Sequence, residues 1–198
     1  AQSPLDLLPS GTAFAIPPLD EDFRLCVALG ERLGVPRLLF HRAAESFEPP
    51  AHLLKMIGEQ NGVKFWNDAR SEGPTATPRA LEGYEQPVMS IGGGMPKGKK
   101  LENFAKEMQK KVKAAFFCGK NANELGKMLK KEQIPVTFCE NLENAVKTAF
   151  ADATRGDQIL FSPAFPTSAE FENMAHRGNM YEKYVLMLIS PVGAHTKS

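Results

Sequence analysis

Residues 58–68, GEQNGVKFWND, decide the fold class of this sequence. Asn61-Gly62 between two apolar runs is the signal of a type I′ turn, so residues 52–59 and the run that starts at residue 63 are expected to form an antiparallel hairpin. Further strand-like apolar runs follow towards the C-terminus and begin at residues 88, 114, 136 and 159. Each gap between them has room for the crossover helix that neighbouring parallel strands require.

This alternation predicts an α/β fold, a Rossmann-like three-layer domain whose mostly parallel sheet has about six strands, one of them an antiparallel edge strand. Towards the N-terminus, residues 20–34 and 36–46 have helical patterns that end at Glu48-Pro49-Pro50. We therefore expect a short helical segment at residues 1–49 and the α/β domain at residues 50–198. Inside that domain, Thr77 and Thr167 are expected to cap helices, Thr167 the last long one.

Composition excludes several classes of protein. The 198 residues are 42% hydrophobic and carry a formal net charge of +1, which describes a globular chain rather than a disordered or coiled-coil one. No apolar run approaches the roughly 20 residues of a membrane span and no secretory signal opens the sequence, so a cytoplasmic protein without a membrane partner is expected. The three cysteines and four histidines lack ligand spacing, which argues against a metal site. Residues 95–131 are rich in lysine, but the near-neutral total favours a solvated helix face over nucleic-acid binding.

The sharpest chemical signal is the loop at residues 92–100, GGGMPKGKK, which follows a predicted strand. Its glycines let backbone amides approach an anion and its lysines add positive charge. It nearly matches a Walker P-loop, but Lys100 stands where the magnesium-binding hydroxyl belongs. Two interpretations stay open, an oxyanion or carboxylate site and a tight turn with solvated lysines. The start of the last helix, at Thr167 and Ser168, is a second candidate for a carboxylate site.

Five stretches, taken in order, resemble the C-terminal domain of the Mur ligase family, and in particular of its D-glutamate-adding members: residues 61–68, 74–81, 93–98, 155–164 and 171–178. The resemblance implies an ATP-dependent ligase of peptidoglycan precursor synthesis. In such an enzyme the carboxylate of UDP-N-acetylmuramoyl-L-alanine becomes an acyl phosphate, and D-glutamate or another amino acid is joined to it. It also implies that ATP and Mg²⁺ bind mainly to domains absent from this sequence, with residues 1–49 as the end of a central ATPase domain. A monomer that is inactive as an isolated fragment is expected.

The resemblance assigns roles to individual residues. Those expected near the amino acid are Lys97 and Thr167, which match carboxylate-binding positions of the family, Ser168 beside them, and Arg70, Glu72 and Met174, which replace a lysine, a threonine and an aromatic residue. Those expected near the nucleotide are Asp68, at the ribose, and His52. The anion loop comprises Gly93, Gly94 and Gly98. No residue of this sequence is assigned a catalytic role or a metal.

Two alternatives remain open. A Mur-like domain that has lost catalysis and binds a small anion or a protein partner is suggested by Leu53, where the family has an arginine, and by Glu72. A ligase for a different amino acid is suggested by Arg70 and Glu72 together, because the pair can recognise an amino-bearing side chain.

Overall fold

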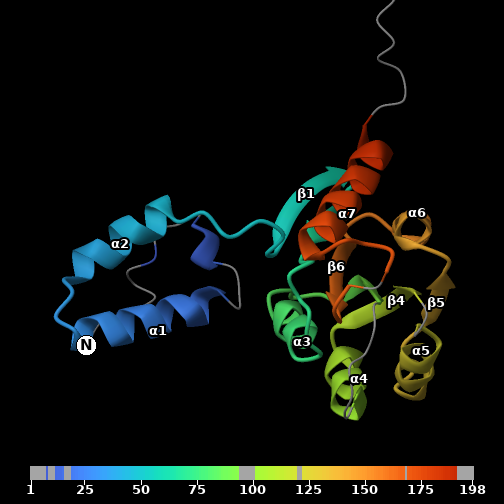
Figure 1. Cartoon of the computed structure of the whole chain (residues 1–198), viewed down its shortest axis with the longest axis horizontal. Coiled ribbons are helices and arrows are strands. Elements are labelled where there is room, and N and C mark those ends of the chain that lie inside the picture. Colours follow the sequence, from blue (N-terminus) through green and yellow to red (C-terminus); the bar gives the residue numbers. More distant parts are fainter. Residues whose placement is uncertain are drawn as a thin grey trace, which may run out of the picture. The chain divides into compact units, whose positions relative to one another are not determined.

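The computed structural model describes residues 8, 12–15, 19–93, 101–119, 122–167 and 169–190. The chain divides into two compact units, residues 1–50 and 51–198 (Figure 1). In the described ranges, no helix combines the length and the apolar character that crossing a membrane requires.

The described part of the first unit contains a 3-10 turn at Ala13–Ala15 and the two predicted helices, α1 (Leu19–Arg32) and α2 (Arg37–Ser46). Three acidic residues lie in the first turn of α1, where their negative charges interact favourably with the positive end of the helix dipole. Phe23, Val27 and Ala44 form a small core between the helices. Phe14 covers it, with its ring 5.1 Å from that of Phe23.

The second unit is built on a six-stranded sheet in the order β1-β2-β6-β3-β4-β5. The strands are β1 (Lys55–Gln60), β2 (Val63–Asn67), β3 (Val88–Gly93), β4 (Val112–Cys118), β5 (Val136–Cys139) and β6 (Gln158–Ala164). All neighbouring pairs are parallel except β1 and β2. The predicted fold class, with its antiparallel edge strand, is confirmed.

The hairpin between β1 and β2 forms at the predicted turn. Asn61 and Gly62 have φ values of 55° and 78°, the two positive angles that a type I′ turn needs. Gln60 and Val63 therefore face each other as the first residue pair of the antiparallel ladder.

Helices cover both faces of the sheet. On one face lie α3 (Ala76–Leu81), α4 (Leu101–Gln109) and α5 (Ala122–Lys131), whose apolar side chains share a core with Leu160 and Phe117. On the other lie α6 (Leu142–Asp152) and α7 (Met174–Ile189), packed on Phe161 and Phe116. Adjacent strand residues thus enter opposite cores, as the alternation of side chains along a strand requires.

The position of β6 between β2 and β3 creates a crevice at the carboxyl ends of the strands. The chain leaves β3 towards α4 on one face and leaves β6 towards α7 on the other. Such a divergence of neighbouring connections is the place where open parallel sheets bind ligands. Gly93 of β3 and Ala164 of β6 are register partners there, so the loops that follow them begin side by side.

Two predicted helix caps are wrong. Thr75, not Thr77, is the N-cap of α3, and Thr77 instead donates to the carbonyl of Ser162 at 3.1 Å. Thr167 is followed by turns and bends, and α7 begins at Met174 with Asn173 as its N-cap. The Asn173 side chain accepts a hydrogen bond from the amide of His176 at 2.8 Å, so this later cap residue satisfies the helix start.

Candidate functional site

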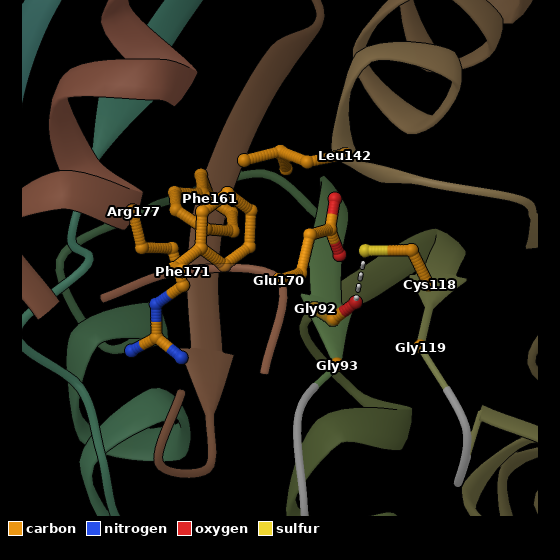
Figure 2. Close-up of a pocket in the computed structure, with 9 residues that line it drawn as sticks. All are labelled: Gly92, Gly93, Cys118, Gly119, Leu142, Phe161, Glu170, Phe171 and Arg177. Carbon is orange, nitrogen blue, oxygen red and sulfur yellow. Dashed lines mark hydrogen bonds between the residues drawn. The ribbon is translucent and has the colours of Figure 1, made fainter. Parts of the chain in front are cut away.

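A small pocket, with a cavity volume of about 20 Å³, occupies the crevice (Figure 2). The ends of β3 and β4, strand β6, the start of α6, the segment before α7 and the first turn of α7 line it. The lining residues are Gly92, Gly93, Cys118, Gly119, Leu142, Phe161, Glu170, Phe171 and Arg177. The walls are mostly apolar or backbone, with one acidic and one basic side chain.

The floor of the pocket needs glycine. Gly93 has a φ of 134°, and a Cβ atom there would lie 2.1 Å from the carbonyl oxygen of Cys118. A Cβ atom on Gly92 would lie 2.6 Å from the ring of Phe117. A side chain on Gly93 would therefore push against the backbone of β4, and one on Gly92 would displace the Phe117 ring. Cys118 donates its thiol proton to the Gly92 carbonyl at 3.8 Å, and burial raises its pKa to about 12.

The rest of the predicted anion loop lies outside the described residues. This holds for Gly94, Lys97 and Gly98, and also for Ser168 after β6. Their assigned roles stay predictions. What the structure places is the start of each loop, at Gly93 and Ala164.

Arg177, in the first turn of α7, joins the loops that follow β2 and β6. It is 3% exposed, and its Nη1 donates to the carbonyl of Phe165 at 2.8 Å while its Nη2 donates to the carbonyl of Ala69 at 3.0 Å. Nη2 also lies 3.6 Å from Oε1 of Glu72. Burial lowers the pKa of Arg177 to about 10, so the guanidinium keeps its charge at neutral pH, and the charge of Glu72 helps to hold it.

Four of the residues predicted to contact the amino acid, Arg70, Glu72, Thr167 and Met174, belong to the described part of the chain. Glu72 pairs with Arg177 through a side chain that is 43% exposed. Arg70 is exposed, and its backbone amide donates to the carbonyl of His52 at 3.3 Å. Thr167 is half-buried beyond Phe165, and Met174 is half-buried at the start of α7.

Asp68, predicted to reach a nucleotide ribose, is 1% exposed and faces the protein interior. Its Oδ2 accepts hydrogen bonds from the hydroxyl of Ser71 and, at 2.9 Å, from that of Ser162. Burial raises the pKa of this carboxyl to about 6, because the loss of water outweighs the stabilising effect of the hydrogen bonds.

His52, the second predicted nucleotide residue, is also buried, with a φ of 63°. Its Nδ1 lies 2.9 Å from Nδ2 of Asn67 and 3.1 Å from Oε1 of Glu182. Gly178 is required beside it, because a Cβ atom there would lie 2.5 Å from the imidazole ring. In this arrangement His52 fastens α7 to the end of β2.

Sequence reasoning gave no role to Arg177. A usable signal is its spacing from Tyr181 and Val185, which follow it at intervals of one helical turn and are fully buried. An arginine on the buried stripe of a helix needs acceptors inside the protein, and is therefore a candidate for a site residue.

Three features of the second unit meet at this crevice. They are a buried cation, a glycine-lined floor and two loops that start side by side. Within the described ranges no group of three or more histidine, cysteine, aspartate or glutamate side chains is arranged to hold a metal ion.

Comparison with known proteins identifies a family whose sequence pattern this chain matches. Residues 54–165 match the family described as Mur ligase, glutamate ligase domain. UDP-N-acetylmuramoylalanine--D-glutamate ligase of Caldicellulosiruptor saccharolyticus is 34% identical over 148 residues, which are 74% of this chain and 33% of the relative. The enzyme of the same name from Protochlamydia amoebophila is 31% identical over 168 residues, 85% of this chain and 38% of the relative. The chain thus spans about a third of the length of these curated relatives.

Solved structures share the fold. UDP-N-acetylmuramate-alanine ligase MurC of Thermotoga maritima superposes with a TM-score of 0.61 at 15% identity, over 86% of this chain and 37% of that one. Folylpolyglutamate synthase of Mycobacterium tuberculosis, complexed with ADP and AMPPCP, gives a TM-score of 0.60 at 12% identity, over 88% and 41%.

Proposed function

Because this chain belongs to the Mur ligase family, we propose that it supplies the amino-acid-binding domain of an ATP-dependent ligase that adds D-glutamate to UDP-N-acetylmuramoyl-L-alanine. The supporting observation is the pairing of Gly93 with Ala164 beside the buried Arg177, because it starts the two predicted carboxylate-binding loops at one crevice. The curated relatives named for this reaction support the choice of D-glutamate.

In this proposal the domain positions the nucleophile. The amino group of D-glutamate attacks the acyl phosphate of the muramoyl-alanine carboxylate, and Lys97 and Thr167 hold the carboxylates of the amino acid. Fixing the amine against its target turns a bimolecular step into an oriented one, which is a large source of rate enhancement. Glu72 and Arg70 follow the carboxyl end of β2.

The described residues do not present a nucleotide site. Asp68 and His52 are buried and contact other side chains of the same chain, so we assign them no role in ATP binding. We propose that ATP and Mg²⁺ bind mainly to other domains of a longer protein. Such a protein is expected to be a cytoplasmic monomer, and residues 1–198 alone are expected to be inactive.

Residues 1–49 are proposed to be the end of the central ATPase domain. Helix α1 buries one apolar face inside its own unit, yet Leu25, Leu29 and Leu33 form a second apolar stripe with exposed fractions of 68%, 63% and 74%. A helix with two apolar faces is typical of the interior of a larger domain.

The experiment is a ligase assay of the longer protein. Phosphate release should require both UDP-N-acetylmuramoyl-L-alanine and D-glutamate, and Lys97→Ala should reduce it at least about a hundredfold, because an anchoring charge for the substrate is lost. Lys64→Ala, an exposed lysine on β2, is the matched control. Full activity of Lys97→Ala would contradict the assignment.

The burial of Asp68 favours one alternative, a Mur-like domain that has lost catalysis and binds a small anion or a protein partner. It predicts that the longer protein releases no phosphate with any amino acid, while this chain still binds a dicarboxylate in calorimetry.

A further inference from the structure

We infer that the ion pair between Arg177 and Glu72 masks an acidic side chain at the amino-acid site, and that this masking lets the site accept an anionic amino acid. The inference rests on the proposed function, which supplies the anionic substrate. It assigns Arg177 a positioning role, because it acts on the substrate through Glu72.

The negative charge of Glu72 is the reason that an ion pair is needed at this position. Glu72 follows the carboxyl end of β2, three residues beyond Ala69, whose carbonyl Arg177 holds, and its carboxylate lies 3.6 Å from Arg177, which lines the pocket. Two like charges about 4 Å apart repel each other in water, and they repel each other more strongly where protein replaces the solvent. An unpaired carboxylate at this position would therefore repel a dicarboxylate substrate.

Arg177 is built to hold that carboxylate. Its two terminal nitrogens are fixed by the carbonyls of Phe165 and Ala69, so the guanidinium cannot swing into solvent. Its Nε has no hydrogen-bond partner in the part of the chain that the structure describes. Among the described residues, Arg177 is the cation that forms an ion pair with Glu72. Arg70, the other arginine near Glu72 in the sequence, has an exposed side chain.

One partner of the pair, Arg177, also reaches the pocket. Arg177 lines the pocket together with Gly92 and Phe171, and Figure 2 shows its side chain running down one wall. Glu170 is the acidic side chain that lines the pocket itself, and like Glu72 it is exposed.

The test uses two substitutions of the exposed partner in the longer ligase. Glu72→Asp keeps the charge but shortens the side chain away from Arg177, and should raise the KM for D-glutamate about fivefold with kcat unchanged. Glu72→Gln removes the charge and should lower that KM about twofold to threefold. The KM for UDP-N-acetylmuramoyl-L-alanine should stay constant in both variants, a selectivity that general damage to the fold would not produce. Glu59→Asp and Glu59→Gln, at an exposed position on β1, are the matched controls.

A second route starts from the buried partner. Arg177→Lys loses the fork that binds both carbonyls and Glu72, and should raise the KM for D-glutamate about tenfold, while Arg177→Lys combined with Glu72→Gln should recover most of the loss. Fluorescence of Trp66, the single tryptophan, reports whether the variants fold. If Arg177→Lys does not fold, the two Glu72 variants decide alone.

The outcomes separate the two proposals. A longer protein that does not ligate D-glutamate refutes the proposed function. An active ligase in which Glu72→Asp and Glu72→Gln move the KM for D-glutamate in the same direction, or not at all, overturns only the masking role of Arg177.

Discussion

Asp68→Asn should change the pH dependence of folding in a way that the buried network dictates. The carboxyl of Asp68 has its pKa raised from 3.8 to about 6 in the folded chain, mainly by burial. The folded state therefore favours the protonated form. Stability associated with this group is present below pH 3.8 and is lost as the pH rises through 6.

The magnitude follows from the shift. A change of about two pKa units corresponds to about 3 kcal/mol of unfolding free energy, because each unit is worth ~1.36 kcal/mol. Roughly half of this loss falls between pH 5 and pH 7.5. Asparagine has no proton to lose and can still accept from Ser71 or Ser162. The unfolding free energy of Asp68→Asn should thus rise relative to the parent by about 1–2 kcal/mol between these two pH values.

Urea unfolding followed by Trp66 fluorescence measures the effect. Trp66 lies on β2, one residue before Asn67, and donates to Gln158 at 2.9 Å, so its emission follows the second unit. Subtracting the variant from the parent at each pH cancels the groups that both proteins share. Asp152→Asn, at an exposed aspartate, controls for the substitution itself. A difference between Asp68→Asn and the parent that is constant from pH 5 to pH 7.5 would refute the burial argument.

Two further predictions test the pocket and the thiols. Gly93→Ala should destabilise the second unit by about 3 kcal/mol or more in the same urea assay, because the added Cβ would meet the Cys118 carbonyl. Gly73→Ala is the control and should be nearly neutral, because no atom lies within 4 Å of the Cβ added there. With a thiol reagent at pH 8, Cys26 should react at least about tenfold faster than Cys118, since Cys26 is exposed while burial raises the pKa of Cys118 to about 12; equal rates would show that the pocket floor opens.

Local sequence determined the elements of this protein. Asn61-Gly62 specifies the hairpin because only a few residues adopt two successive positive φ angles without strain. The apolar runs specify the strands because their side chains alternate between two cores. The same runs, with the motifs at the strand ends, also carried the family resemblance, which the match over residues 54–165 confirms. The cap predicted at Thr77 failed because its hydroxyl bonds to the Ser162 carbonyl, and the cap predicted at Thr167 failed because Asn173, six residues later, caps α7.

Tertiary structure alone decided the order of the strands and the partners of the buried charges. The last strand, β6, inserts between β2 and β3, and this places Ala164 beside Gly93. Arg177 binds the carbonyl of Ala69 and Asp68 accepts from Ser162 across separations of 108 and 94 residues. No local pattern encodes such contacts, since they arise only when the two helical layers close on the sheet and water leaves these groups. The sequence therefore predicted which loops form the candidate site, and the packing of the sheet determined which charged groups face one another in that site.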